Sequence, residues 1–336
     1  MFRFIKEKAK RVRELGLRES GVRLGHKLFK RANPLPSIPP TVFIELTNNC
    51  NLNCIMCDRE SMTRKTGFID MDSYRKIIDN ASRIGVPDIK LNRFGEPFIH
   101  PSLTEMVRYA KSKDIPRVYF TSNATLLTET NTRKILEAGL DGIAFSVDGA
   151  NKDTYKTIRN ADFDKVTKNI ERFCQMKKEM GMEKPRVQLN TILMNETEHE
   201  MMHIFQRWNS IVNYINVLPV AQYGNVPDLS TTSKSQRQLC ACEHPFDRLM
   251  VFWNGDVTVC CGDINGELKI GNIHENPLEE LWTNERITSL RHMHRTKRFN
   301  KIPLCQHCDG TKADVYKQMH RQRQQIYKNA EELGLS

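Results

Sequence analysis

The sequence of 336 residues lacks the features that mark several large classes of protein. No apolar run approaches the roughly 20 residues that a membrane-spanning helix needs. The N-terminal segment has neither the apolar stretch nor the small-residue cleavage site of a signal peptide. There is no P-loop, no Gly-x-Gly-x-x-Gly fingerprint and no aromatic platform for reading RNA. We therefore expect a cytosolic (cytoplasmic) protein with no nucleic-acid partner.

Acidic residues are scarce near both ends of the chain. Residues 1–31 carry eleven Lys and Arg against three Asp and Glu, and residues 286–328 carry eleven against two. The first segment also spaces its apolar residues as short amphipathic helices do. An N-terminal helix of this kind could contact an anionic membrane surface from the side. A solvated helix at each end is the plainer interpretation.

The middle of the chain alternates strand and helix patterns. Four prolines within residues 33–40 mark a linker, and six strand patterns then alternate with helix patterns over residues 41–220. Such alternation predicts a parallel α/β sheet covered by helices. Six units are too few for a closed eight-stranded barrel, so an open partial barrel or a doubly wound sheet is expected. We divide the chain into an N-terminal extension, an α/β core, a cysteine-rich module and a C-terminal helix, at residues 1–36, 37–225, 236–312 and 313–336.

Three closely spaced cysteines, Cys50, Cys54 and Cys57, follow the first strand pattern. They therefore lie at the C-terminal end of a strand, which is where parallel sheets place their chemistry. In a reducing compartment, clustered cysteines indicate metal ligands rather than disulfides. A structural zinc site would need a fourth ligand. Three thiolates instead suit an iron–sulfur cluster that keeps one iron open for a small molecule.

The Cys50-x3-Cys54-x2-Cys57 spacing resembles the signature of the radical S-adenosylmethionine (SAM) superfamily. The resemblance implies a partial (βα)6 TIM-like barrel and a 4Fe–4S cluster whose open iron binds SAM. It also implies that reduction cleaves SAM to methionine and a 5′-deoxyadenosyl radical. Two positions depart from the usual pattern, because Met56 stands where an aromatic residue is common and Phe94 replaces a glycine.

Later strand ends carry residues that match the SAM-binding positions of this family. The resemblance implies contacts to SAM from Gly95, Glu96, Pro97, Ser122, Asn123, Ser146, Asp148, Arg159 and Asn190, of which Asn190 is the weakest match. Arg159 resembles the arginine that pairs with the SAM carboxylate, a task that suits the bidentate geometry of a guanidinium. Without the family, polar residues at strand ends can also be explained as caps of turns.

Six of the ten cysteines lie between residues 240 and 308, where two short strand patterns flank "NGD" and predict a hairpin. Together with "WNGD", "GNI" and "LEELW", these cysteines resemble the SPASM/twitch extension of radical SAM enzymes. Their number implies one fully ligated auxiliary 4Fe–4S cluster. The expected ligands are Cys242, Cys260, Cys305 and Cys308, with Cys261 as a substitute for Cys260 and Cys240 as a substitute for Cys242. A structural zinc held by four thiolates is the alternative.

These resemblances predict a radical SAM oxidoreductase that acts on a small polar substrate, such as a sugar or an aminocyclitol. A single auxiliary cluster is most similar to the 2-deoxy-scyllo-inosamine dehydrogenases, in which the cluster accepts an electron. An epimerase is an alternative, with the spare thiol of Cys261 as the hydrogen donor. A peptide-modifying maturase is another, and a non-catalytic metal-bound adaptor is a distant one. A reducing partner such as flavodoxin or ferredoxin is expected.

Overall fold

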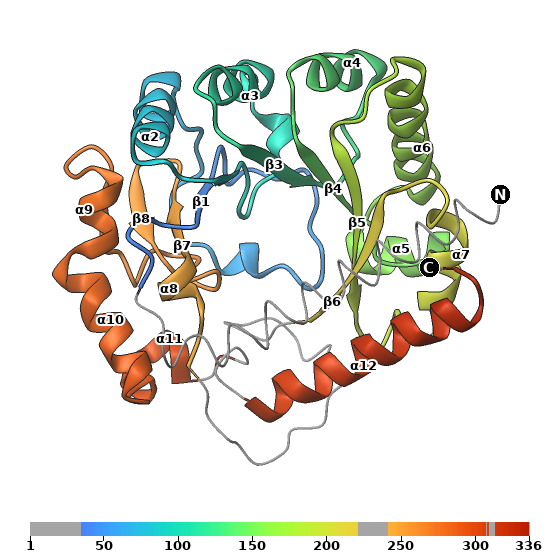
Figure 1. Ribbon diagram of the computed structural model, residues 1–336. Helices are drawn as coiled ribbons and strands as arrows, with labels where there is room; N and C mark the ends of the chain where they lie inside the picture. Colours follow the sequence, from blue (N-terminus) through green and yellow to red (C-terminus); the bar gives the residue numbers. More distant parts are fainter. Residues whose placement is uncertain (1–34, 221–240, 307, 309–312, 336) are drawn as a thin grey trace.

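The computed structural model describes residues 35–220, 241–306, 308 and 313–335 (Figure 1). The expected N-terminal helices and Cys240 lie outside the described residues. Among the helices that the structure describes, none is both long and apolar enough to cross a membrane.

The described residues form one continuous nine-stranded sheet in the order β6-β5-β4-β3-β2-β1-β7-β8-β9 (Figure 1). Strands β1 to β7 pair in parallel, and β8 and β9 are antiparallel to their neighbours. The six strands expected from the sequence are confirmed. The strands are β1 (Thr41–Ile44), β2 (Asp88–Lys90), β3 (Arg117–Ser122), β4 (Gly142–Ser146), β5 (Arg186–Leu193), β6 (Tyr214–Pro219), β7 (Arg248–Val251), β8 (Asp256–Thr258) and β9 (Gly271–Asn272).

Helices cover the outer, convex side of the curved sheet, where α2, α3, α4 and α6 form an arc (Figure 1). Local sequence explains their ends: in α2, for example, Asp70 accepts a hydrogen bond from the Ser73 amide and Gly85 ends the helix in the left-handed conformation. The helices are α2 (Met71–Ile84), α3 (Leu103–Ser112), α4 (Glu129–Glu137), α5 (Lys152–Arg159), α6 (Phe163–Glu179), α7 (Met201–Trp208), α8 (His244–Asp247), α9 (Leu278–Thr283), α10 (Glu285–Arg295), α11 (Pro303–Gln306) and α12 (Ala313–Glu332).

The two faces of the sheet differ in polarity. In β5, Val187 and Leu189 are buried against the helices, whereas Gln188 and Asn190 on the inner face are only half-buried. A closed core would bury both faces in apolar side chains. The alternation therefore fits an open, partial barrel with a polar interior, and the expected α/β fold class is confirmed.

The cysteine-rich module continues the sheet of the core. Strands β7 and β8 form the hairpin expected around "NGD", where Gly255 has a φ of 84°. The sequence did not reveal that β7 would pair in parallel with β1, from Thr41 opposite Arg248 to Ile44 opposite Val251. Strand β1 is therefore flanked by β2 on one side and by the module on the other.

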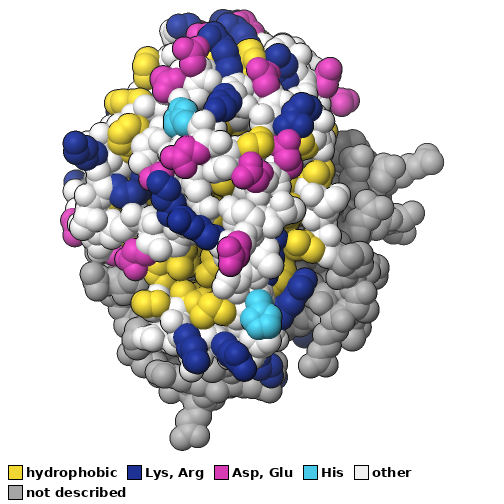
Figure 2. Space-filling model, turned by 90° about the vertical axis from the view of Figure 1, so that its left-hand side faces the viewer, with side chains coloured by type: hydrophobic (Ala, Val, Ile, Leu, Met, Phe, Trp, Pro, Cys, Tyr) yellow, Lys and Arg dark blue, Asp and Glu magenta, His cyan; other side chains and the backbone are white. Residues whose placement is uncertain are grey.

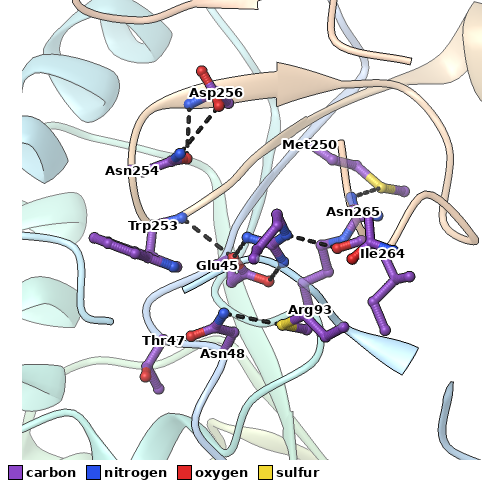
Figure 3. A network of polar contacts seen from close by, with 12 residues as sticks. Glu45, Thr47, Asn48, Arg93, Met250, Trp253, Asn254, Asp256, Ile264 and Asn265 are labelled. Carbon is purple, nitrogen blue, oxygen red and sulfur yellow. Dashed lines mark hydrogen bonds and ion pairs between the residues drawn. The ribbon is translucent and has the colours of Figure 1, made fainter. Parts of the chain in front are cut away.

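A buried carboxylate joins the module to the loop that carries the first three cysteines (Figure 3). Glu45 follows β1, is fully buried, and accepts hydrogen bonds from Arg64 Nη1 and Nη2 at 3.0 and 2.9 Å. Arg64 Nε donates to the carbonyl of Ile264 at 2.6 Å, and the Trp253 amide donates to Glu45 at 3.3 Å. We call Glu45, Arg64, Trp253 and Ile264 the clamp.

A second connection lies on the outside, between α2 and α9. Arg83 of α2 forms an ion pair with Glu279, and the Leu278 amide donates to Asn80 Oδ1 at 3.0 Å. Figure 2 shows basic and acidic side chains interspersed over this end of the molecule. Exposed pairs of this kind contribute little stability compared with the clamp.

We predict that Glu45→Ala lowers the free energy of unfolding by about 3–5 kcal/mol, because it leaves the Arg64 guanidinium without its buried counter-charge. Urea denaturation of the purified protein measures the loss. The matched control is Glu105→Ala, which removes an exposed partner of Arg75 at 3.1 Å and should cost about 1 kcal/mol or less. Equal losses in the two variants would contradict the role of the clamp.

Candidate active site

The loop that carries the first three cysteines is closed at its base by the residues after β1. Asn48 donates to the carbonyl of Lys65 at 2.9 Å and accepts from the Gly67 amide at 2.9 Å. Thr47 Oγ1 donates to the Gly67 carbonyl at 2.7 Å. The intervening segment is therefore held as a loop above the end of β1, with Cys50, Cys54 and Cys57 half-buried on it.

Two side chains, one that follows β3 and one at the end of α5 (Lys152–Arg159), reach these thiols. Asn123 Nδ2 lies 3.8 Å from Cys50 Sγ, and Arg159 Nη1 lies 3.8 Å from Cys54 Sγ. Burial raises the pKa of Cys54 to about 11, so the free thiol is protonated at neutral pH. N–H donors directed at sulfur favour the thiolate that metal ligation requires. The donor set therefore fits an iron–sulfur cluster.

The turn after β2 packs against the chain that leads to the cysteines. The Glu96 amide donates to the Asn49 carbonyl at 2.9 Å. At Gly95 a Cβ atom would lie 2.1 Å from the Thr47 carbonyl oxygen and 2.8 Å from that of Asn49, so only glycine fits. The Gly95–Pro97 turn and the cysteine loop are therefore one packed unit.

The side chain of Glu96 ties the turn to the end of β3. It accepts from Ser122 Oγ at 2.8 Å and from the Asn123 amide at 2.7 Å. Burial raises the pKa of Glu96 to about 7, against the effect of these donors. Glu96 and Ser122 are thus engaged with each other and fix the position of Asn123. Their expected contact with SAM stays a prediction.

Arg159 is held by a buried carboxylate. Asp148 is fully buried and accepts from Arg159 Nε at 2.7 Å and from Nη2 of the same guanidinium. The Ile192 amide donates to the other carboxylate oxygen at 2.6 Å. Although burial disfavours the charge, Asp148 raises the pKa of Arg159 above its ordinary value. Arg159 ends α5, a helix that the sequence analysis missed although Asn151 caps it.

Ser146 and Asn190 occupy neighbouring positions on the inner face of β4 and β5. Asn190 Oδ1 accepts from Gln188 Nε2 at 2.6 Å and from Asn216 Nδ2 at 3.1 Å. These amides form a polar row across β5 and β6. Asn190 therefore belongs to the polar interior, and its role toward SAM stays a prediction.

The second set of cysteines is gathered from four segments of the module. Cys242 precedes α8, Cys260 and Cys261 follow β8, Cys305 lies in α11 and Cys308 follows it. Burial, with smaller contributions from the nearby thiols of Cys261, Cys308 and Cys305, raises the pKa of Cys242 to about 12. The pKa of Cys260 is raised in the same way, by burial first and then by Cys261, Cys242 and Cys308. The expected ligands are thus brought together, with Cys261 among them, while Cys240 lies outside the described residues.

His294 of α10 was given no role by the sequence analysis, yet it contacts two of these cysteines. Its Nδ1 accepts from the Cys242 amide at 3.3 Å, and its Nε2 lies 3.8 Å from Cys305 Sγ. Burial lowers the pKa of His294 to about 4, so the ring is neutral. No spacing in the sequence marks this residue, because its partners lie on separate segments.

Among the described residues, no three His, Cys, Asp or Glu side chains are arranged to hold one metal ion. An iron–sulfur cluster requires a different arrangement, in which each thiolate binds its own iron.

Comparison with known families agrees with this geometry. The model of the radical SAM superfamily matches residues 44–207, and the SPASM model, an iron–sulfur cluster-binding domain, matches residues 240–309. The chain therefore contains a radical SAM domain followed by a SPASM domain. Radical SAM domains bind SAM and a 4Fe–4S cluster, and SPASM domains bind auxiliary iron–sulfur clusters, so the expected cofactors are confirmed at the level of the domains.

Several known proteins are similar to this chain in sequence or in fold. The tungsten-containing aldehyde ferredoxin oxidoreductase cofactor-modifying protein of Pyrococcus furiosus is 24% identical over 80% of this chain and 86% of its own. BtrN, solved with AdoMet and 2-DOIA, has a TM-score of 0.57 at 19% identity, covering 81% of this chain and 93% of BtrN. Streptococcus suis SuiB, solved with the precursor peptide SuiA, has a TM-score of 0.63 at 13% identity over 80% and 70%. The chain spans only about half the length of the GTP 3′,8-cyclases it also matches.

We predict that Gly95→Ala sharply reduces both iron content and SAM cleavage, because the added methyl group would displace the turn from the cysteine loop. Iron assay and chromatography of 5′-deoxyadenosine measure the two effects. Gly142→Ala is the control, since its methyl group would meet only ordinary contacts at 3.4 and 3.7 Å. Wild-type iron and cleavage in Gly95→Ala would refute the packing argument.

Proposed function

We propose that this radical SAM protein is an oxidoreductase that removes hydrogen from a small polar substrate, a sugar or an aminocyclitol, and passes an electron to an auxiliary cluster. The observation that carries the proposal is that both sets of cysteines lie beside strands of one sheet and are connected through the clamp. Strands β4, β5 and β6, which lie between the two sets in the sequence, carry half-buried polar side chains on the inner face of that sheet. The neighbour BtrN, solved with the small molecule 2-DOIA, supports a small substrate.

Several residues have separate roles at the site of the first three cysteines. Cys50, Cys54 and Cys57 hold the cluster, and the Gly95–Pro97 turn supplies backbone groups toward SAM. Arg159, fixed by Asp148, presents its remaining N–H groups to the SAM carboxylate. When bound, the cluster and SAM supply a 5′-deoxyadenosyl radical. Asn123 stabilises the Cys50 thiolate by its N–H donor.

The inner face offers hydrogen-bonding side chains to a substrate. Gln188, Asn190 and Asn216 form a polar row, and Ser146 lies beside them on β4. Amide and hydroxyl side chains form hydrogen bonds with the hydroxyl groups of a sugar. Beside an apolar substrate, the same side chains would be left without hydrogen-bond partners. The substrate would lose one hydrogen atom to the 5′-deoxyadenosyl radical, one electron to the auxiliary cluster and one proton to solvent, which together convert an alcohol to a carbonyl.

Cys242, Cys260, Cys305 and Cys308 are proposed to hold the auxiliary cluster that receives this electron. A flavodoxin or ferredoxin would supply the electron that starts each turnover. Cys261 is exposed while the other four are half-buried or buried, and this favours epimerisation as a second candidate, with the Cys261 thiol returning a hydrogen atom. Modification of a peptide or of another protein's cofactor is a further alternative, because SuiB was solved with a bound precursor peptide and the Pyrococcus relative is named a cofactor-modifying protein.

We predict about eight irons per chain after anaerobic reconstitution, and about four in a variant that carries Cys50→Ala, Cys54→Ala and Cys57→Ala. Iron and sulfide assays with EPR of the reduced protein provide the measurement. Cys54→Ala alone should abolish SAM cleavage, and Cys174→Ala, which changes a packed cysteine of α6, should leave iron and cleavage unchanged. Four irons in the wild type and zinc in the module would remove the electron-acceptor role.

We predict that product formed from a candidate sugar in deuterium oxide contains no deuterium at the attacked carbon and is two mass units lighter than substrate. The reason is that oxidation returns no hydrogen to the substrate radical. Mass spectrometry of the product decides the matter. A product of unchanged composition with one deuterium, lost in Cys261→Ala, would establish epimerisation instead.

A further inference from the structure

Arg93 connects the SAM-binding side of the protein to the second set of cysteines. It follows β2 and precedes Gly95 by two residues, so its backbone belongs to the first site. Its side chain extends into the C-terminal module (Figure 3). No motif in the sequence marks this residue, and nothing in the proposed reaction has used it so far.

The guanidinium of Arg93 holds the loop that begins at Cys260. Nη2 donates to the carbonyl of Cys260 at 2.9 Å and to that of Asp263 at 2.5 Å. Nη1 lies 3.1 Å from Met250 Sδ, and the guanidinium carbon lies 4.6 Å from the centre of the Phe252 ring. The loop conformation at Cys260 therefore depends on a residue of the radical SAM core.

One donor of Arg93 remains unused among the described residues. The Nε–H is buried and has no hydrogen-bond acceptor there. A buried donor without a partner costs free energy unless a ligand satisfies it. Burial lowers the pKa of Arg93, while Glu45, Asp263 and the thiols of Cys260 and Cys261 oppose that shift. The positive charge of Arg93 thus interacts with two of the five described thiols of the module, those of Cys260 and Cys261.

Other cations near these thiols have different partners. Arg248 pairs with Asp247 at 2.7 Å, and Lys90 lies 5.1 Å from the centre of the Phe43 ring. Among the residues that the structure describes, neither donates a hydrogen bond to the Cys260 loop, whereas Arg93 donates to the backbone carbonyl of the cysteine itself. Arg93 therefore combines position, charge and a free donor at one site.

We propose that Arg93 is a positioning residue for the auxiliary cluster: it holds the Cys260 loop against the radical SAM core and raises the reduction potential of the cluster bound there. Accepting an electron makes a thiolate-ligated cluster more negative, and a nearby cation stabilises the more negative state. The inference rests on the proposed occupancy of the module by an iron–sulfur cluster. If Arg93 has this role, a residue of the radical SAM core sets the reduction potential at which the module accepts the electron from the substrate.

The test uses the protein in which Cys50, Cys54 and Cys57 are alanine, so that only the auxiliary cluster titrates. Arg93→Gln and Arg93→Lys are added to this parent, and the midpoint potential is measured by EPR-monitored titration. We expect Arg93→Gln to shift the potential to more negative values and Arg93→Lys to shift it less. Arg83→Gln is the matched control, because Arg83 also joins core and module, through Glu279, and should leave the potential unchanged.

An unchanged potential in Arg93→Gln, or equal shifts in Arg93→Gln and Arg83→Gln, overturns the role of Arg93. If Arg93→Gln loses its iron while Arg83→Gln keeps it, the holding role is supported, and Arg93→Lys, which keeps the positive charge, decides the electrostatic one: a potential close to that of the parent supports it, and a large negative shift overturns it. A parent that contains zinc instead of iron overturns the proposed auxiliary cluster, and the inference with it. The metal content of the parent therefore separates failure of the proposed function from failure of Arg93.

Discussion

A carboxylate buried directly after β1 constrains the rest of this structure. Glu45 has no access to solvent, so it must be ionically paired and hydrogen-bonded to be tolerated there. Its partners come from the segment after the first three cysteines and from the hairpin of the SPASM domain. The Glu45–Arg64 ion pair thus fixes the position of the chain that follows the first cysteine loop, and Glu45 also holds the hairpin of the module next to β1.

The strand ends around this point are joined by further buried pairs rather than by apolar packing alone. Glu96 connects the turn after β2 to β3, and Asp148 connects β4 to Arg159 and to β5. Each carboxylate accepts hydrogen bonds from a side chain and a backbone amide of other segments of the chain. The positions of the donors near the thiols follow from these pairs, which explains why polar residues cluster at one edge of the sheet.

Local patterns in the sequence were sufficient for the parts of the fold that depend on neighbouring residues. The alternation of strands and helices, the "NGD" hairpin and the three-cysteine loop at the end of β1 were all predicted from short segments. The parallel pairing of β1 with β7, the contacts of Arg64 and Arg93, and the contacts of His294 were not. These join residues far apart in the chain and have no periodicity or spacing that a single sequence displays. Helix α5 was missed for another reason, since its eight residues are too short to show an apolar period.

The pairing of β1 with β7 has a consequence for synthesis of the protein. Strand β1 ends at Ile44, but its second neighbour, β7, ends at Val251. One edge of β1 therefore stays unpaired until most of the chain has left the ribosome. An unpaired strand edge can associate with other chains. A nascent chain whose synthesis stops before β7 thus exposes an unpaired edge of β1 next to the cysteine loop. Completion of the C-terminal domain therefore covers this edge of β1.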